Sequence, residues 1–225
     1  MKKISSTYNY YNVILLAYEI TKGMKSIGSK SLMPIKIDNH SDTLIKHQLH
    51  SIRKHIKKIA SINIVLGFDK DKVKKKINFG NDIKIIDNDH YETYGQSYAI
   101  GLALKQIDNN YPTIIISNYT ILRKNIFQQC NNNTNHIFCI KNCTNKFFKI
   151  GCTHHNGKVE YLCYELSPKW SEIFMLQPEA KTSLLNIIDA NTNMLFFESI
   201  NLLLSLYPTS NTYIYNNSLI TVNHK

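Results

Sequence analysis

Residues 12–37 read NVILLAYEITKGMKSIGSKSLMPIKI, and this stretch decides the fold class. The apolar run Val13–Ala17 is typical of a strand that is buried on both faces, as at the centre of a parallel sheet. A polar bend follows it, then Lys30 and the apolar segment Leu32–Ile35. In α/β sheets, a buried strand, a loop and a second apolar anchor present a phosphate-binding loop at the strand's carboxyl end. We therefore expect this stretch to hold the position of such a loop.

Strand patterns and helix patterns alternate downstream of this stretch as far as Ser117. Residues Thr43–Lys58 carry apolar side chains at helical spacing, and Ser41 or Asp42 is available to cap that helix. The other expected elements are strands Ile62–Leu66, Ile83–Ile86 and Thr113–Ser117 and helices Asp69–Ile77 and Gly95–Ile107. This order predicts an α/β fold with a doubly wound, mostly parallel sheet.

The pattern changes after Ile121, where short strands follow one another. Residues 131–135 (NNNTN) have the composition of a loop, and no element is assigned to Leu166–Met175. Asn156-Gly157 is expected to form a hairpin turn. The expected elements are strands His136–Lys141, Phe147–Thr153, Val159–Glu165, Thr212–Tyr215 and Leu219–Val222 and helices Gln177–Ile188 and Met194–Leu206. We expect one domain over residues 1–225, with a βα half at 1–122 and a mixed-strand half at 123–225.

Composition excludes several classes of protein. The 225 residues are 43% hydrophobic and 19% charged, which is typical of a folded globular chain. No run approaches the roughly 20 apolar residues of a membrane span, and Glu19 interrupts the first apolar stretch, so we expect neither a membrane segment nor a signal peptide. The 5 cysteines are an odd number, which favours reduced thiols in a cytoplasmic chain. Heavy use of Asn, Ile, Lys and Tyr fits an AT-rich genome such as that of a virus, which makes a virion the alternative location.

The net charge of +11 raises the possibility of nucleic-acid binding. Much of it lies in residues 53–58 (RKHIKK) and 70–76 (KDKVKKK), which we interpret as the solvated faces of two helices. A nucleic-acid-binding module remains an alternative, and it requires one contiguous basic face. The lysines that would have to share this face are Lys54, Lys57, Lys58, Lys72, Lys75 and Lys76.

Several segments resemble the sugar-phosphate and choline-phosphate nucleotidyltransferases. That family opens with a pattern close to LAAGxGxRM followed by PKxLLPI, and this chain has Leu16-Ala17, then Lys30 and Pro34-Ile35. Residues 88–104 (NDHYETYGQSYAIGLAL) resemble the family's loop and helix that hold base and substrate. Residues 215–222 resemble its closing strand, which precedes a metal-binding aspartate. The resemblance implies a Rossmann-like, GT-A-type fold and Mg²⁺-dependent transfer of NMP from an NTP to a phosphorylated sugar or alcohol.

The predicted phosphate loop departs from the family at its functional positions. Glu19 and Thr21 stand where the family has glycines, whose missing Cβ lets the backbone approach a triphosphate. Glu19 also brings a negative charge toward anionic phosphates. Gly23 stands where the family has an arginine that clamps phosphate, and Lys30 alone matches a phosphate-contacting position. We interpret Ala17, Glu19, Thr21, Gly23 and Lys30 as a vestigial loop.

The implied metal site is altered in the same way. In the family an apolar strand ends in Gly-Asp, and its aspartate holds Mg²⁺, whereas here Ile114–Ile116 is followed by Ser117-Asn118. The family's second metal aspartate aligns with Asn223. Because Mg²⁺ is usually held by one or two carboxylates plus substrate phosphates, two neutral amides remove the charge that the ion needs.

These departures predict a pseudoenzyme that serves as a structural, assembly or binding component and needs no cofactor. Its partners are then expected to be proteins, in a homo-oligomer or a larger assembly. The alternative is an active transferase that uses Mg²⁺, an NTP and Lys30, with a metal site relocated to Asp87, Asp89 or Glu198.

Three further groups carry residue types that could form sites. The cysteines and histidines could hold zinc, but their spacing fits no paired knuckle, which favours buried thiols. The acidic residues of the loop Asp87–Glu92 could bind a ligand or metal, or this loop could be only a polar connection between a strand and a helix. The aromatic side chains could line a pocket or belong to the core or an interface. The three groups are Cys139, Cys143, Cys152, His154, His155 and Cys163; Asp87, Asp89, His90 and Glu92; and Tyr91, Tyr94, Tyr98 and Trp170.

Overall fold

The computed structural model describes residues 10–18, 28–77, 80–108, 110–130, 134–143 and 148–222. In chain order its elements are β1 (Tyr11–Ala17), η1 (Lys30–Leu32), β2 (Pro34–Ile37), β3 (His40–Thr43), α1 (Leu44–His55), β4 (Ile59–Leu66), α2 (Lys70–Lys74), β5 (Ile83–Asp87), α3 (Gln96–Leu104), β6 (Thr113–Ile116), β7 (Thr120–Leu122), η2 (Phe127–Gln129), β8 (Asn135–Ile140), β9 (Ile150–His155), β10 (Lys158–Tyr164), β11 (Lys169–Leu176), α4 (Pro178–Ala190), α5 (Phe196–Leu204), β12 (Thr209–Ile214), η3 (Asn216–Ser218) and β13 (Leu219–Thr221).

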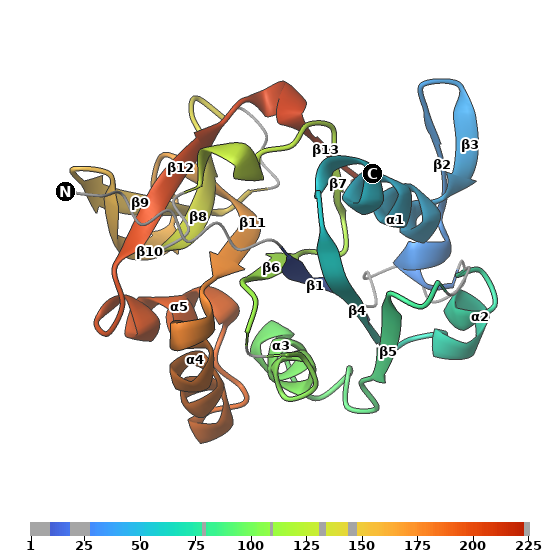
Figure 1. Cartoon of the computed structure of the whole chain (residues 1–225), viewed down its shortest axis with the longest axis horizontal. Helices are drawn as coiled ribbons and strands as arrows, with labels where there is room; N and C mark the ends of the chain where they lie inside the picture. Colours follow the sequence, from blue (N-terminus) through green and yellow to red (C-terminus); the bar gives the residue numbers. More distant parts are fainter. Residues whose placement is uncertain are drawn as a thin grey trace.

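A nine-stranded sheet runs through the molecule in the order β5-β4-β1-β6-β11-β8-β12-β10-β9 (Figure 1). Strands β5, β4, β1 and β6 are parallel to one another, and β1 pairs with β4 on one side and β6 on the other. Every residue of β1 from Asn12 to Ala17 is buried. A strand that is hydrogen-bonded along both edges and covered on both faces has no solvated side, which explains the apolar run Val13–Ala17. The predicted α/β fold with a central, mostly parallel sheet is confirmed.

The second half of the sheet is mixed, as the change of pattern after Ile121 predicts. Strand β11 is antiparallel to both β6 and β8, and it joins the two halves of the chain in one sheet. No strand was predicted for this segment, so β11 is missing from the predicted elements. Glu172 has a left-handed φ of 58°, and the register with β8 shifts between Trp170 and Phe174. This irregularity interrupts the alternation of inward and outward side chains by which a strand is recognised.

The structure corrects some of the other predictions for this half of the chain and confirms one. Asn135 does not belong to a loop, because it begins β8 and its side-chain Oδ1 accepts a hydrogen bond from the Gln177 N–H (2.8 Å). Strand β12 lies inside the sheet, between β8 and β10, instead of closing it. The predicted turn at Asn156-Gly157 is confirmed, because His155 pairs with Lys158 and both turn residues have positive φ (49° and 76°).

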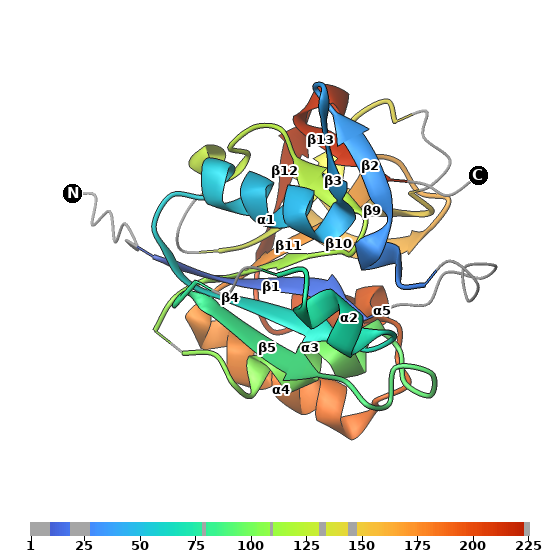
Figure 2. The ribbon, with the colours of Figure 1, turned by 90° about the vertical axis from the view of Figure 1, so that its right-hand side faces the viewer.

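Helices cover both faces of the sheet, which makes it doubly wound (Figures 1 and 2). Ile14 and Leu16 of β1 belong to the core beneath α3, α4 and α5. Val13, Leu15 and Ala17 belong to the opposite core, together with residues of α1 and α2. Alternate residues of one strand therefore supply two separate cores. None of the helices in the described parts of the chain is long and apolar enough to cross a lipid bilayer.

Two small ladders stand apart from the main sheet, and the sequence analysis does not predict their pairing. Strands β2 and β3 form a hairpin, and β7 pairs with β13. The hairpin overturns the predicted cap of α1, because Ser41 and Asp42 belong to β3 and the N-cap residue is Thr43, whose side chain makes no capping hydrogen bond. Instead, Oδ1 of Asp42 accepts a hydrogen bond from the Thr43 N–H (2.7 Å).

We predict that Gly151→Ala destabilises the fold. A Cβ at Gly151 of β9 would clash with the carbonyl oxygen of Leu166 and lie 2.7 Å from that of Pro168. Because both obstacles are backbone atoms, the strand has to move, and we expect a loss of about 3 kcal/mol in the free energy of unfolding, measured by urea denaturation. Gly95→Ala is the control, since nothing lies within 4 Å of a Cβ there, and it should cost at most about 1 kcal/mol. Equal losses in the two variants would contradict this account.

Candidate nucleotide-site edge

The carboxyl ends of β1, β4 and β6 carry the predicted site, because β1 is parallel to both β4 and β6 and the three strands end along one edge of the sheet. Ala17 ends β1 and is buried, and its carbonyl oxygen accepts a hydrogen bond from the Ser31 hydroxyl (3.3 Å). This contact joins the end of β1 to η1, where Lys30 lies. Glu19, Thr21 and Gly23 lie outside the described residues, so their predicted roles stay predictions.

The structure brings Lys30 next to the segment that follows β6. Lys30 is only 5% exposed, and its Nζ lies 4.9 Å from the centre of the Tyr119 ring. An ammonium group above an aromatic face is attracted by the ring's quadrupole. The one cation that matches the family's phosphate contacts is thus buried against an aromatic ring at this edge.

Asn118 lies two residues beyond the end of β6 and is 2% exposed. Helix α1 supports the turn around it, because Nε2 of Gln48 donates hydrogen bonds to the carbonyl oxygens of Ser117 (3.3 Å) and Thr120 (3.1 Å). The hydroxyl groups of Ser117 and Thr120 also lie 3.0 Å apart. Asn118 therefore occupies a position that is determined by contacts with α1 and within its own turn.

The β7–β13 ladder leads the C-terminal segment toward Asn118. Thr221 pairs with Thr120, and the Val222 N–H donates to the carbonyl oxygen of Tyr119 (2.9 Å). The described residues end at Val222, so the predicted second metal position, Asn223, lies outside them. The ladder brings the chain at Val222 next to the segment 118–120.

Among the described residues, the position that the resemblance assigns to a Mg²⁺ ligand carries no carboxylate. Asn118 offers a neutral amide where a carboxylate is needed, and Mg²⁺ is a hard cation that prefers charged oxygen ligands. Among the residues that the structure describes, no three His, Cys, Asp or Glu side chains are grouped so that they could hold a metal ion.

The acidic loop after β5 is engaged by lysines of α2. Nζ of Lys70 lies 2.6 Å from Oδ1 of Asp89 and 3.4 Å from Oδ2 of Asp87, and Nζ of Lys74 lies 2.9 Å from Oδ2 of Asp87. The hydrogen bond to Lys70 lowers the pKa of the Asp89 carboxyl group. Glu198, the third residue proposed for a relocated metal site, instead accepts a hydrogen bond from the Leu195 N–H at the start of α5 (2.9 Å). The structure therefore does not assemble these three carboxylates into one site.

The aromatic side chains separate into two places. The rings of Tyr94 and Tyr98 lie 4.6 Å apart, with His90 beside both, while Tyr91 packs against Phe68 at 6.2 Å. Trp170 is 2% exposed and belongs to the core, where its Nε1 donates to the carbonyl oxygen of Ile173 (2.9 Å). The interpretation of Trp170 as part of a tyrosine-lined pocket is therefore wrong, and the core alternative is confirmed for it.

The cysteines do not form a zinc site with the neighbouring histidines in the described parts of the chain. Cys139 and Cys152 are buried free thiols whose sulfur atoms lie 3.5 Å apart. Nε2 of His154 lies 2.7 Å from the hydroxyl oxygen of Tyr213, so this imidazole is already hydrogen-bonded. The hydrogen bond with Cys152 and burial raise the pKa of the Cys139 thiol. A thiol that stays protonated at neutral pH is a poor metal ligand.

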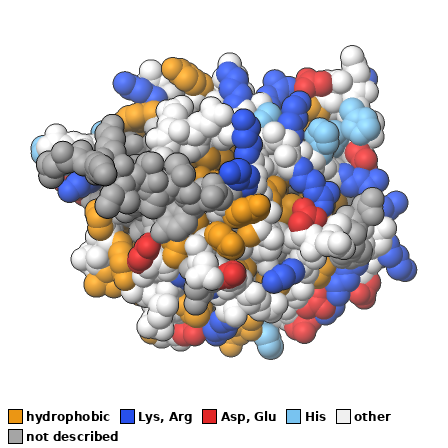
Figure 3. Space-filling model, in the orientation of Figure 1, with side chains coloured by type: hydrophobic (Ala, Val, Ile, Leu, Met, Phe, Trp, Pro, Cys, Tyr) orange, Lys and Arg blue, Asp and Glu red, His pale blue; other side chains and the backbone are white. Residues whose placement is uncertain are grey.

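The six lysines proposed for a nucleic-acid face do not lie along one edge. Lys57 and Lys58 directly precede β4, whereas α2, which carries Lys72, directly follows it, so the two groups lie at opposite ends of an eight-residue strand. Nζ of Lys72 also pairs with Asp69 (3.0 Å). Figure 3 shows Lys and Arg side chains scattered over this face of the molecule, with Asp and Glu between them on its right-hand side. This distribution weakens the nucleic-acid alternative.

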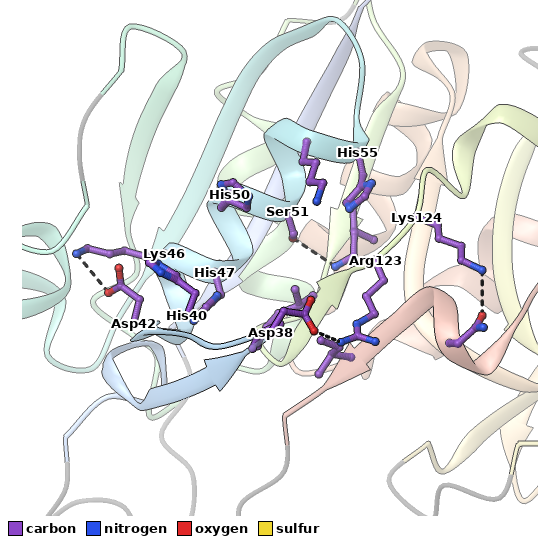
Figure 4. A pocket seen from close by; sticks show the side chains of 16 residues that line it. Asp38, His40, Asp42, Lys46, His47, His50, Ser51, His55, Arg123 and Lys124 are labelled. Carbon is purple, nitrogen blue, oxygen red and sulfur yellow. Dashed lines mark hydrogen bonds and ion pairs between the residues drawn. The ribbon is translucent and has the colours of Figure 1, made fainter.

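A cleft beside α1 was not predicted from the sequence (Figure 4). The cleft has a volume of about 750 Å³ and lies between α1, the β2–β3 hairpin and the β7–β13 ladder. Its walls carry four histidines and four lysine or arginine side chains: His40, His47, His50, His55, Lys46, Lys54, Arg123 and Lys124. The spacing of Lys46, His50 and Lys54 on the predicted helix is the signal that could have revealed one wall of it.

No family model matches this chain, and no curated protein matches it either. Solved structures do match it. The CTP:phosphocholine cytidylyltransferase from Streptococcus pneumoniae has a TM-score of 0.71 and 16% identity, over 94% of this chain and 93% of that chain. The inositol-1-phosphate CTP transferase from T. maritima has a TM-score of 0.74 and 10% identity, over 94% and 88%. The chain has the nucleotidyltransferase fold. A nucleoside-diphosphate-sugar pyrophosphorylase from Vibrio cholerae agrees, with a TM-score of 0.66 and 15% identity over 93% and 94%.

The nucleotidyltransferase fold confirms the resemblance that residues 16–35 and 88–104 suggest. Identities of 10–16% establish the fold alone, so they carry no activity over to this chain. The chemistry of the site has to be argued from the residues at the strand ends. The predicted degeneration of the loop and metal ligands therefore remains a prediction.

We predict that native Cys130 resists alkylation. With a pKa of about 12, its thiolate fraction at pH 8 is about a thousandfold below that of a thiol of ordinary pKa. Its reaction with iodoacetamide, followed by mass spectrometry, should be slower by about the same factor in the native protein than in urea. Labelling at the same rate in both states would show that burial does not hold this proton.

Proposed function

We propose that this chain is a nucleotidyltransferase-fold protein that does not transfer nucleotides and acts by binding. The observation that carries the proposal is Asn118. This residue follows β6, at the position that the resemblance assigns to a metal-binding aspartate, and it is buried in a turn braced by Gln48. Because nucleotidyl transfer depends on neutralising phosphate charge, a site without this carboxylate loses its main catalytic device.

The surroundings of Asn118 support the same conclusion. The ammonium of Lys30 lies against the Tyr119 ring, a position in which it contacts an aromatic face of the protein. The carboxylates of Asp87 and Asp89, at the end of β5, are already paired with lysines of α2. An ion that approached them would have to compete with two ammonium groups. These pairs count against a relocated metal site, which the alternative of an active transferase requires.

A protein that keeps this fold without its catalytic groups has to act through a surface. We therefore propose protein partners, in a homo-oligomer or a larger assembly. Exposed large side chains on β10 and α5 support such contacts, because tyrosine is enriched at interfaces. These side chains are Tyr161 (51% exposed), Tyr164 (49%) and Leu202 (49%). Light scattering of the purified chain would report its oligomeric state directly.

We predict that the chain neither binds Mg²⁺–NTP in the micromolar range nor releases pyrophosphate. Titration calorimetry with CTP, UTP or dTTP in the presence of Mg²⁺ should give only the heat of dilution. A pyrophosphate assay with phosphocholine or a sugar 1-phosphate should match the blank without protein. The proposal fails if Mg²⁺-dependent pyrophosphate release appears and Lys30→Ala abolishes it.

A gain-of-function variant tests the reason for this inactivity. Asn118→Asp/Asn223→Asp restores both carboxylates of the implied metal site, so added Mg²⁺ should raise its Tm while leaving the Tm of the unaltered chain unchanged. The matched control is Asn110→Asp/Asn193→Asp, which makes the same charge change at two exposed positions. If Mg²⁺ raises the Tm of the control equally, the effect is one of surface charge and does not locate a metal site.

A further inference from the structure

The cleft between α1, the β2–β3 hairpin and the β7–β13 ladder, here called the α1 cleft, has an apolar floor. Ile121 and Leu122 of β7 are almost fully buried beneath it, and Ile37 and Ile220 are half-buried at its sides. Its volume of about 750 Å³ falls within the range of small-molecule sites. An apolar floor under charged walls suits a ligand with an apolar body and a charged group.

Helix α1 supplies one wall of the α1 cleft. Lys46, His50 and Lys54 are four residues apart, as are His47, Ser51 and His55, so they form two adjacent rows on one side of the helix. Arg123 lies opposite these rows just beyond the end of β7, and Lys124 lines the cleft beside it with its side chain directed toward Asn217 (Figure 4). Positive and titratable side chains thus converge on the cleft from two separate segments of the chain.

The acidic side chains of the α1 cleft balance only part of this charge. Oδ1 of Asp38 lies 3.2 Å from the Arg123 guanidinium, and Oδ1 of Asp42 lies 3.3 Å from Nζ of Lys46. Lys124 donates only to the neutral amide of Asn217 (3.3 Å), and Lys54 has no carboxylate partner among the described residues. Two formal positive charges therefore remain on the walls before any histidine is protonated.

One histidine of the cleft responds to its burial and to this excess. His55 has a pKa below its ordinary value, because it is partly buried and because Lys54 and His50 lie close enough to repel its protonated form. Electrostatic repulsion of a protonated imidazole lowers its pKa only where no nearby anion offsets the positive charges. The α1 cleft has the electrostatics of a receptor for negative charge.

We propose that the α1 cleft binds a small phosphate monoester that carries an apolar group. Its dianion matches the two excess charges of Lys54 and Lys124, and its apolar body covers the half-buried side chains of Ile37 and Ile220. Arg123 and the α1 histidines add hydrogen-bond donors around the phosphate oxygens. The cleft is distinct from the strand-end edge that holds Asn118 and Lys30, and the proposal does not depend on whether that edge is catalytic.

Phenyl phosphate is the probe that tests this assignment, with binding followed by NMR of the histidine side chains. We expect the imidazole signals of His50 and His55 to move in a saturable way. Benzoate, which has the same ring but a single carboxylate charge, should bind more weakly. Binding of benzoate that equals or exceeds that of phenyl phosphate would overturn the assignment to a phosphate.

Paired lysine variants separate a built site from general charge attraction. Lys54→Gln/Lys124→Gln should weaken phenyl phosphate about tenfold, because two charge pairs are lost. Lys84→Gln/Lys158→Gln removes the same charge from exposed positions on β5 and β10, and it should bind as the unaltered chain does. All four side chains are exposed, so both variants should keep the native Tm. Equal weakening in the two variants, or no saturable shift at all, would overturn the proposal.

The same site should bind more tightly at lower pH. A bound dianion favours protonated imidazole, so the pKa of His55 rises on binding, and affinity increases as pH falls from 8 to 6. One unit of coupling gives about a fivefold gain over this range, and protonation of the free phosphate, whose second pKa is about 6, reduces the net gain to roughly two- to threefold. The titratable and charged groups that face the cleft are Asp38, His40, Asp42, Lys46, His47, His50, Lys54, His55, Arg123 and Lys124. An affinity that is flat with pH while His55 titrates would contradict the placement of the phosphate beside it.

Discussion

The hydrogen bonds that join β1 to β4 and to β6 determine where the other elements of the molecule lie. Seven residues of β1 pair with β4 on one edge, four of them pair with β6 on the other, and its side chains alternate between the two cores. Because Asn12–Ala17 of this strand are buried, α1 and α2 have to cover one face and α3, α4 and α5 the other. The strand ends at Ala17, so any site that the chain builds from the loops that follow lies beyond that residue.

The same arrangement shows that the shape of the strand-end edge rests on contacts that need no metal ligand. Gln48 of α1 holds the turn after β6 through two carbonyl oxygens, and Ser51 of α1 accepts a hydrogen bond from the Leu122 N–H (3.3 Å). These contacts are made by backbone groups of the turn, so they do not require an aspartate at Asn118. The shape of this edge therefore does not depend on its catalytic chemistry, because different atoms are responsible for each.

Two regions of the molecule differ in how their charges are balanced. At the strand-end edge the carboxylates of Asp87 and Asp89 are paired with lysines of α2, and Lys30 is buried against an aromatic ring. In the α1 cleft the acidic side chains neutralise only Lys46 and Arg123, which leaves an excess of positive charge above an apolar floor. A ligand is attracted where charge is unbalanced and surface is available, and this contrast separates the two proposals.

Local sequence patterns were sufficient for the parallel half of the sheet. The apolar runs of β1, β4 and β6 and the amphipathic spacing of α1 report burial directly, because most residues that are covered on every side are apolar and the buried polar ones, such as Asn63, are hydrogen-bonded. The departures predicted at Glu19, Thr21, Gly23, Asn118 and Asn223 also come from the sequence, since they concern residue type, and they remain predictions. Strand β11 was not predicted because Glu172 interrupts the alternation of inward and outward side chains along it. The burial of Trp170 depends on α5, which lies far along the chain.

The α1 cleft could not be predicted either, because it is formed by segments that are distant in sequence. Its walls come from residues 37–55, 121–124 and 217–220, and only the pairing of β7 with β13 and the folding of the β2–β3 hairpin bring their charges together.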